Sequence, residues 1–589
     1  MQSPSLDALR TPANGQIFGL KTALSNAAVE EAFAAASREA SGRRLGKTIR
    51  QKGTLNGGAY RASFICFPLT RRPAFLPGTD LAENTYGFLL LIEVEVNGEW
   101  YVGVFQHDAA TVADWIDARA KRLPRGKFTN AFSENSTVRR MSLQRMTASK
   151  HELRAASYEA SDLLSSLPMM AAGRCVIRSI RFQNHLMGSI AVTISTSRVQ
   201  QSGGRRTVDD LAELVAVVVQ QTQANKRHVF LTKFAQSVAL ADLPAGVEPT
   251  SVLFDWGAIL ENDALELYRK PNPQEELGHQ IAKEVLSRFL EGTMPVTPEG
   301  TGNWRFGTRP QSPRGRLALT STRYSVKSIL SNLLVVRDVD SDETMTLVRW
   351  VRENDAYSVT FTQPEYFFGS GALYQRANFA SEVDSVRQCL RPEPLLAVAT
   401  SEKGEPKPTD VSFADESIFG LVDGSIYAQR DWLVCNDLGD EWADFICVRD
   451  NTLLFLHCKH GKPTTGASSF QDVIGQALKN LGRIQSTPSL FKDKLAAIEA
   501  NNPQWAGTQI RRLRGAGTWP AFQAAVGALL VNPDVSKEVH LVVSMISKAA
   551  FEAAAAAPTP HFIQQVWLLS SFVNSCREMG GKPVIVCLP

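Results

Sequence analysis

The pattern of apolar and polar positions is clearest near residue 450, where two apolar runs flank a short polar segment. ADFICV at 443–448 and LLFLHCK at 453–459 are each typical of a buried strand. The RDNT segment between them contains Asp450 and Asn451, which suit a tight turn. With these two residues as the loop, Arg449 lies opposite Thr452, and the two runs form an antiparallel hairpin.

The pattern after this hairpin changes to the helical period. FQDVIGQALKNL at 470–481 predicts an amphipathic helix, since its apolar residues recur three and four positions apart. The hairpin and this helix are expected to belong to one α/β domain over residues 401–589.

The patterns in residues 1–250 predict a mixed α+β region. This region is expected to have a sensing or regulatory role. TYGFLLLIEVEVNGEWYVGVFQH at 85–107 predicts a hairpin, because Asn97-Gly98 is a preferred two-residue turn. Helical patterns occupy 27–40 and 207–223, and Thr207 is suited to cap the second.

Residues 251–400 predict a β-rich middle region. A helical stretch at 275–291 leads into the segment 291–316, whose many Gly, Pro, Thr and Ser residues indicate a linker or long loop. Short β-like runs follow at 316–375, and EKGEPKPTD at 402–410 has the composition of a second joint. The chain is thus expected to be an α/β multidomain protein divided near 250 and 400.

Composition places the chain among cytoplasmic globular proteins. Its 589 residues suggest roughly two to four domains, and 44% hydrophobic and 21% charged residues are ordinary for this class. No cationic segment followed by an apolar one opens the sequence, and no apolar run approaches the ~20 residues that span a bilayer. Eight cysteines without a CxxC pair favour reduced, buried thiols.

The charge of +4 does not indicate a general nucleic-acid coat. Three local basic segments can contact phosphates instead, although each is also compatible with a surface loop. KRLPRGK lies at 121–127 and VRRMSLQRMTASK at 138–150, while RRLRG at 511–515 is close to Trp505 and Trp519, which can stack on bases or belong to the core.

Three ionisable residues are expected to converge at one end of the hairpin. Counting back along both strands places Asp444 opposite His457, and Lys459 shares their face. Cys458 falls on the other face, which argues against a zinc site, and His460 follows the strand in a loop. A carboxylate can hold Mg²⁺ or Mn²⁺, and a lysine beside it can offset charge on a phosphorane-like transition state.

GDEWADFI, LHCKHG and FQDVIGQALKNL together resemble the PD-(D/E)XK nuclease superfamily, over about residues 405–589. In the tail, the resemblance implies that EVHLVVSMISKAAF at 538–551 is a strand, HFIQQVWLLSSFVNSCREMGG at 561–581 a helix and KPVIVCLP at 582–589 a last strand. The resemblance implies a restriction-endonuclease-like αβββαβ domain in which Asp444 binds the metal, Lys459 is catalytic and Gln476 acts from the following helix. His457 stands where the family has Glu or Gln, and would bind the metal or position water. Glu416 is the candidate for a further acidic ligand, with Glu441 and Asp437 as rivals.

The resemblance implies a magnesium- or manganese-dependent hydrolase that binds and cleaves DNA, rather than RNA, in antiviral or anti-plasmid defence. A non-catalytic nucleic-acid-binding or scaffold subunit with a degenerate nuclease fold is the alternative. A motor driven by nucleotide hydrolysis is disfavoured, because the sequence has no acceptable P-loop. No membrane partner is expected, and a partner protein or a second copy of the chain remains open.

Overall fold

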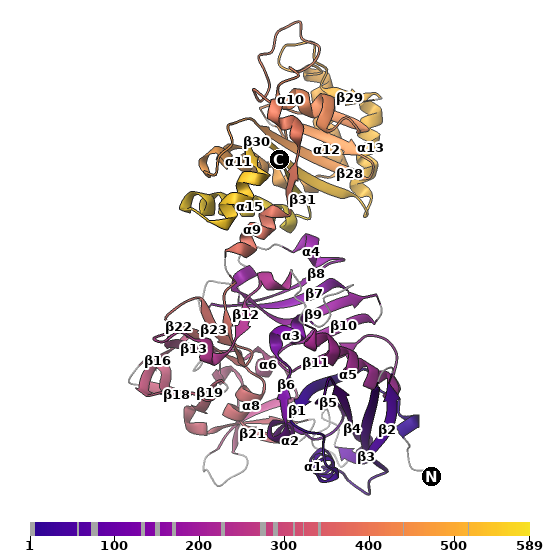
Figure 1. Ribbon diagram of the computed structural model, residues 1–589, viewed down its shortest axis with the longest axis vertical. Helices are drawn as coiled ribbons and strands as arrows, with labels where there is room; N and C mark the ends of the chain where they lie inside the picture. Colours follow the sequence, from indigo (N-terminus) through magenta and orange to yellow (C-terminus); the bar gives the residue numbers. More distant parts are fainter. Residues whose placement is uncertain are drawn as a thin grey trace. The chain divides into compact units, whose positions relative to one another are not determined.

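The computed structural model divides the chain into two compact units. Unit 1 comprises residues 1–161 and 173–377, and unit 2 comprises 162–172 and 378–589. Both units combine helices with sheets, so the chain is a mixed α/β protein (Figure 1). The structure describes residues 6–55, 58–71, 81–130, 136–147, 154–167, 172–185, 187–224, 230–270, 278–286, 293–309, 312–321, 323–339, 343–377, 379–439, 441–515 and 517–589.

The first sheet of unit 1 is antiparallel and has eleven strands in the order β2-β3-β4-β5-β1-β11-β10-β9-β7-β8, with β6 paired to β1. Its strands and helices are β1 (Asn14–Leu20), α1 (Asn26–Ala36), β2 (Gly46–Leu55), β3 (Gly58–Arg71), β4 (Glu83–Val96), β5 (Glu99–His107), α2 (Ala113–Arg119), β6 (Ala120–Arg122), α3 (Arg125–Asn130), β7 (Ser136–Arg145), β8 (Ala155–Glu159), β9 (Cys175–Asn184), β10 (Gly188–Thr193), β11 (Arg198–Gln201) and α5 (Val208–Gln223).

Two sequence predictions in this sheet are confirmed. Val96 pairs with Glu99, and both residues of the Asn97-Gly98 turn have positive φ, at 51° and 79°. Thr207 caps α5 in a capping box with Asp210, which satisfies two backbone N–H groups at the helix start. The basic segment from 138 onward forms β7, and its residues 148–150 lie outside the described part of the chain.

A nine-stranded and a four-stranded antiparallel sheet complete unit 1, with strand orders β12-β24-β23-β22-β13-β16-β17-β18-β19 and β15-β14-β20-β21. Their elements are β12 (Gln236–Val238), β13 (Pro249–Phe254), α6 (Gly257–Leu260), β14 (Leu265–Arg269), β15 (His279–Ile281), β16 (Thr293–Gly300), β17 (Asn303–Arg309), β18 (Ser312–Leu319), β19 (Tyr324–Ile329), β20 (Leu334–Asp338), β21 (Glu343–Thr346), α8 (Leu347–Glu353), β22 (Tyr357–Phe361), β23 (Tyr366–Gly369) and β24 (Ala372–Gln375).

The prediction of a linker at 291–316 was wrong. The segment forms β16, β17 and most of β18, whose Met294, Trp304 and Phe306 are buried in the core of this part of unit 1. Its prolines and glycines occur at shifts of the strand register, for example between Pro298 and Gly300, where an irregular backbone is tolerated. The helix predicted at 275–291 was wrong at 279–281, which form strand β15, whereas residues 284–286 are helical as predicted.

Unit 2 is built on a seven-stranded mixed sheet in the order β25-β31-β30-β28-β27-β26-β29. Its elements are α4 (Leu163–Ser166), α9 (Ala380–Arg387), β25 (Leu390–Pro392), α10 (Ile418–Leu421), β26 (Trp432–Cys435), β27 (Phe445–Arg449), β28 (Thr452–Lys459), α11 (Gln471–Asn480), α12 (Pro488–Asn501), β29 (Leu513–Gly515), α13 (Trp519–Val531), β30 (Ser536–Ser547), α14 (Lys548–Ala556), α15 (Pro560–Glu578) and β31 (Lys582–Leu588). The strands and helices predicted from 443 to 589 are present, except that the strand predicted at 538–551 ends at Ser547, which caps α14.

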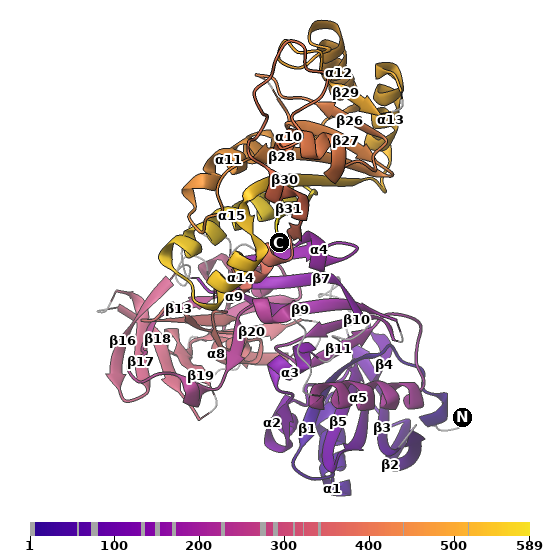
Figure 2. The ribbon, with the colours of Figure 1, turned by 45° about the horizontal axis from the view of Figure 1, so that its top comes forward.

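The two faces of this sheet carry separate cores. Ile446, Val448 and Phe455 pack with residues of α11 and α15 on one face. Figure 2 shows the ribbons of α11, α15 and this sheet from a second direction. Phe445 and Leu456 pack on the other face with residues of α10. Because both faces are covered, the central strands are mostly apolar, as the sequence around 453–458 indicated. The division of the chain falls at 377, whereas composition placed it near 400.

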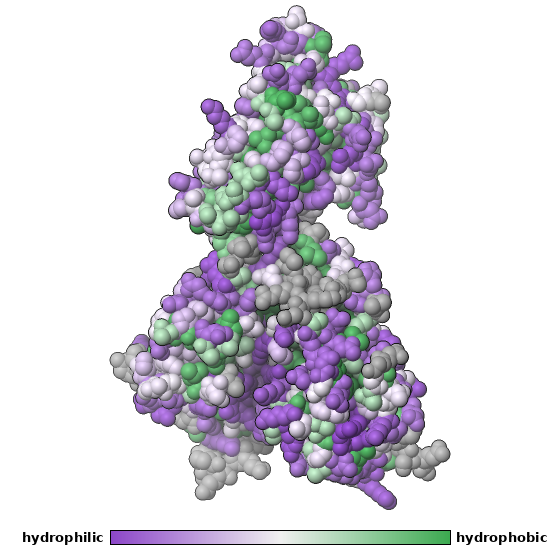
Figure 3. All heavy atoms as spheres, in the orientation of Figure 1, coloured by the Kyte–Doolittle hydropathy of each residue, from purple (hydrophilic) through white to green (hydrophobic). Residues whose placement is uncertain are grey.

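The surface shown in Figure 3 is mainly hydrophilic, with hydrophobic residues in scattered groups. The large hydrophobic side chains that are exposed come from many elements, among them Leu81, Tyr86, Val411 and Val531. Scattered exposure of this kind is normal for a folded chain. No helix in the described part of the chain is long and apolar enough to cross a membrane.

Candidate metal centre

The hairpin that carries the predicted site has the predicted register. Arg449 pairs with Thr452, and the ladder continues to Phe445 opposite Leu456, so the next opposed pair is Asp444 and His457. Asp450 occupies the turn with a φ of 52°, a conformation that Asp tolerates. Cys447 and Cys458 are buried on the face of α10, as their parity required, and the eight cysteines are thiols rather than disulfides.

Asp444 belongs to a group of three carboxylates with Asp437 and Glu441. One oxygen from each lies within 4.8 Å of the others. Asp437 and Glu441 come from the loop that joins β26 to β27, and this loop is short because the two strands are adjacent and antiparallel. The backbone N–H of Asn436 donates to the carbonyl of Asp444 over 2.7 Å and closes the base of the loop. The carboxylates are therefore brought together by the strand pairing itself.

Buried side chains fix the position of Asp437. The indole N–H of Trp505 donates to its Oδ2 over 2.7 Å. The guanidinium of Arg512 is 3% exposed and donates to the carbonyls of Asp437 and Cys435. These two residues belong to the segment that the sequence offered as a phosphate or base contact. They serve the core and the loop instead, while the neighbouring Arg511 is exposed.

The segment before α10 supplies an acid and a base to the same group. Lys403 Nζ lies 2.9 Å from Asp437 Oδ1, and Glu402 Oε2 lies 3.2 Å from Lys459 Nζ. Lys403 also acts electrostatically on Asp444. Through Glu402 and Lys403, Lys459 on β28 is connected to the carboxylates at the start of β27.

Sequence reasoning missed Glu402 and Lys403. It assigned 402–410 to a joint between domains, because Pro, Gly and charged residues dominate that stretch. The segment is instead part of unit 2, where Ser401 forms a bridge with Ser417. Nothing in its local composition distinguishes a linker from a loop that contacts distant strands.

Burial and mutual repulsion change the protonation of the carboxylates. Burial raises the pKa of Asp444 to about 7 despite the opposing hydrogen bond from the Cys458 N–H, and nearby Glu441 adds to the rise. Burial and Asp437 likewise raise the pKa of Glu441. For Lys403 burial lowers the pKa, but the hydrogen bond and charge of Asp437 outweigh burial and raise it. The group therefore holds more negative charge than its own lysine offsets, which favours an added cation.

The donor set suits a hard divalent ion. Carboxylate oxygens are the preferred ligands of Mg²⁺ and Mn²⁺. The Glu441 carboxylate makes no hydrogen bond or ion pair with the described residues, so its oxygens are available. Asn436, in the same loop, is fully buried and its Oδ1 has no hydrogen-bond partner among the described residues. A buried oxygen without a partner, in the loop that carries Asp437 and Glu441, is consistent with a ligand set that is complete only with a cation.

Three predicted site residues lie outside the carboxylate group. Glu416 is exposed, and it is its rivals Asp437 and Glu441 that join Asp444. His457 is 2% exposed within β28, and burial alone lowers its pKa to about 4, so the ring is neutral at pH 7. Gln476 is half-buried on α11, the helix whose Lys479 acts electrostatically on Glu441. Lys459 is thus linked to the carboxylates through Glu402 and Lys403. Neither His457 nor Glu416 is grouped with the three carboxylates.

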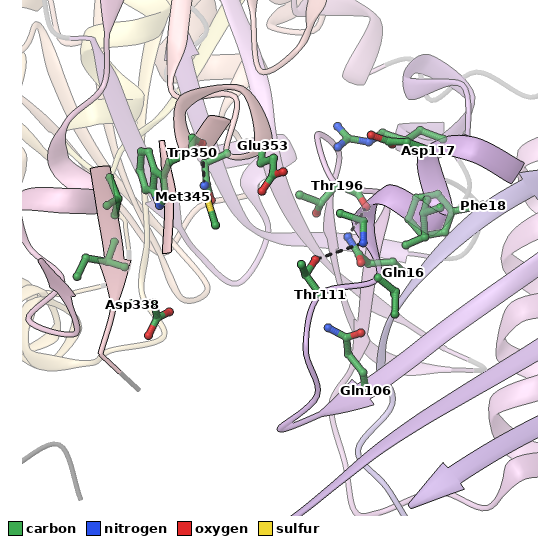
Figure 4. Close-up of a pocket in the computed structure, with 17 residues that line it drawn as sticks. Gln16, Phe18, Gln106, Thr111, Asp117, Thr196, Asp338, Met345, Trp350 and Glu353 are labelled. Atoms are coloured by element: carbon green, nitrogen blue, oxygen red, sulfur yellow. Dashed lines mark hydrogen bonds between the residues drawn. The ribbon is translucent and has the colours of Figure 1, made fainter. Parts of the chain in front are cut away.

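Unit 1 contains a polar cavity of about 350 Å³, shown in Figure 4. Gln16, Thr111 and Asp117 line one side of it, and Asp338 and Glu353 lie on the other. The Gln16 amide donates to the Thr196 carbonyl over 3.1 Å. The cavity has acids and amides on both walls but no cluster with ligand geometry among the described residues, so the chemistry is concentrated in unit 2.

Comparison with known proteins does not assign the chain to a family. No family model matches it, and no curated protein matches its sequence.

Proposed function

We propose that unit 2 is a divalent-metal-dependent nuclease domain that cleaves phosphodiester bonds, with DNA as the substrate. The observation that carries the proposal is the group of Asp437, Glu441 and Asp444, whose oxygens lie within 4.8 Å of one another beside the strand that bears Lys459. The succession of α10, three antiparallel strands, α11 and the parallel strand β30 supports the resemblance to the PD-(D/E)XK fold.

The residues of this chain have distinct roles in the proposed reaction. Asp437, Glu441 and Asp444 would hold Mg²⁺ or Mn²⁺, which when bound lowers the pKa of water and offsets phosphate charge. Lys459 presents an ammonium that stabilises charge on the phosphate oxygens, and Glu402 orients it. Asp444 must be deprotonated to act as a ligand, and its pKa near 7 makes this step dependent on pH.

The direct test is cleavage of plasmid DNA, single-stranded DNA and RNA by the full-length protein with Mg²⁺ or Mn²⁺. Lys459→Ala and Asp444→Asn should each reduce cleavage about 100-fold or more, because each removes a group that acts on the reacting phosphate or holds the ion. Lys462→Ala is the matched control, since Lys462 is exposed and lies three residues beyond Lys459. It should cleave as the wild type does.

One observation favours the alternative of a non-catalytic nucleic-acid-binding subunit. His457, at the position where the superfamily has Glu or Gln, is neutral and buried, and it is not grouped with the carboxylates. On this alternative the protein binds nucleic acid, yet wild type and Lys459→Ala are equally inactive with every substrate and metal. Equal cleavage by the two proteins would also contradict the nuclease proposal.

The proposed role in defence against foreign DNA is supported only by the resemblance to the PD-(D/E)XK superfamily. A cell-based test is the efficiency of phage plating or plasmid transformation in cells that express the wild type. Asp444→Asn serves as the inactive comparison.

A further inference from the structure

A second concave site lies in unit 1, at the point where β1, β5 and β6 meet the end of α5. The cavity has a volume of about 580 Å³, which is within the range of small-molecule sites. Its charged lining consists of four cations, Lys21, Lys121, Arg122 and Lys127, and one acid, Glu99. The segment that carries Lys121, Arg122 and Lys127 is the basic stretch at 121–127 that the sequence offered as a phosphate contact.

The strand register explains why the cavity exists. Gly19 on β1 lies between Tyr101 of β5 and Lys121 of β6. A β-carbon at Gly19 would be 3.7 Å from the Tyr101 ring and 3.8 Å from the Lys121 carbonyl, so the glycine leaves the floor open without being required by backbone strain. Lys21 follows directly after β1 and lines the same cavity. The floor is thus flanked by an aromatic ring and two lysines.

Hydrogen bonds hold the opposite wall in place. Gln223, the last residue of α5, donates to the Tyr101 hydroxyl over 2.9 Å, and Tyr101 donates to Glu99 over 2.6 Å. Asn97 in the hairpin turn donates to Gln223 over 2.6 Å. α3, which carries Lys127, packs on α5, and both helices lie near β1 and β5 in Figures 1 and 2. The wall is therefore formed before any ligand arrives.

The cations are available for a ligand. Lys21, Lys121 and Lys127 are exposed, and their ammonium groups make no ion pair or hydrogen bond with the described residues. Arg122 is engaged, since it donates to the Ser195 carbonyl and lies 3.4 Å from Asp355. α5 ends at this cavity, and the partial negative charge of its carbonyl end is about half a unit at most. The three lysines carry a positive charge several times larger, so the helix end does not neutralise them.

We propose that this cavity binds the phosphate groups of a nucleotide. Lysine ammonium groups bind phosphate as compact point charges, and three of them around one concavity match a di- or triphosphate or two adjacent phosphates of a strand. The volume is larger than phosphate alone needs, and Tyr101 borders the remaining space. The nucleotide is either free or at the end of an oligonucleotide. The inference does not depend on the carboxylate site of unit 2.

Isothermal titration calorimetry of the full-length protein tests the site, in buffer with EDTA so that metal binding in unit 2 does not contribute. The ligands are a purine nucleoside triphosphate and a 5′-phosphorylated single-stranded oligonucleotide. The triple variant Lys21→Gln/Lys121→Gln/Lys127→Gln should bind at least about tenfold more weakly than the wild type. Gly19→Leu should also weaken binding, because its side chain occupies the floor.

Lys52→Gln is the matched control, because Lys52 is exposed on β2 with the parity of the opposite face of the same sheet. It removes one charge and should leave affinity unchanged. If the triphosphate binds, the ligand of the cavity is a free nucleotide. If only the oligonucleotide binds, the ligand is the end of a nucleic-acid strand. Absence of binding by both ligands, or equal affinity of the triple variant and the wild type, would overturn the proposal whatever the cleavage assays give.

Discussion

The carboxylate of Asp444 accepts a hydrogen bond of 2.6 Å from the backbone N–H of Cys458. Cys458 is the residue between His457 and Lys459, so this bond ties the start of β27 to the end of β28. It fixes the carboxylate that the metal proposal needs most, even though burial disfavours the charged form of Asp444.

Asp444→Asn should stabilise the metal-free protein at pH 8 by about 2 kcal/mol. The pKa of Asp444 is raised from 3.8 to about 7, so the folded state binds more protons than the unfolded state between these values. The contribution of Asp444 to stability therefore falls as pH rises from about 4 to about 7, and stays unfavourable above. Chemical denaturation at pH 5 and pH 8 measures the difference.

The same substitution should abolish stabilisation by Mn²⁺. The wild type is expected to gain thermal stability on adding the ion at pH 8 and to gain less at pH 6, where Asp444 is largely protonated. Glu416→Gln is the control, since Glu416 is an exposed carboxylate outside the group. An equal loss of the Mn²⁺ effect in both variants would contradict the assignment of the ligands.

Lys403→Met should raise the affinity for Mn²⁺ about tenfold, because the Lys403 ammonium competes with the ion for Asp437. The variant should also lose stability in the absence of metal, since it leaves the buried carboxylates without their counter-ion. Calorimetric titration compares it with Lys407→Met, which removes an exposed lysine from the same segment. A weaker affinity in Lys403→Met would mean that Lys403 supports the ion rather than competing with it.

His457→Gln should leave Mn²⁺ affinity within about threefold of the wild type, because His457 is not grouped with the carboxylates. It should change how stability depends on pH. Burial lowers the pKa of His457 from 6.5 to about 4, so the neutral ring contributes stability that is lost as pH falls through this window. The difference between wild type and variant in denaturant titrations at pH 7 and pH 4.5 isolates the histidine.

A buried network on β30 should stabilise unit 2 independently of metal. Glu538 accepts hydrogen bonds from His540 and Lys582, and His540 contacts the Tyr427 hydroxyl over 2.7 Å. Burial raises the pKa of Glu538, but these two bonds outweigh burial and lower it from 4.5 to about 2. The stabilisation is thus full above about pH 4.5 and is lost as pH falls toward 2.

Glu538→Gln should accordingly cost about 2 kcal/mol at pH 7. Glu499→Gln removes an exposed carboxylate from α12 and should change stability by less than about 0.5 kcal/mol. Urea unfolding of both variants, with and without Mn²⁺, measures the costs. Similar values for the two would show that the network does not stabilise the fold.

The sequence by itself determined the hairpin of β27 and β28 and the helix α11 that follows it. Two apolar runs joined by the Asp450-Asn451 turn predicted this hairpin and its register, because a two-residue loop sets which residues of the two strands lie opposite each other. The same register puts Cys458 on the face of α10, as predicted. Sequence reasoning failed at 291–316, where composition indicated a linker and three strands are found.

Only the tertiary structure decided which groups surround Asp444. Glu402 and Lys403 lie some forty residues away in sequence, and they reach the centre because α10 packs their segment onto the sheet. It also separated Glu416 and His457 from the carboxylates, since exposure and burial depend on which elements cover each strand end. The period of the apolar residues shows on which face of a strand or helix a residue lies. The residues that contact it on that face come from segments distant in the sequence, so only the folded chain identifies them.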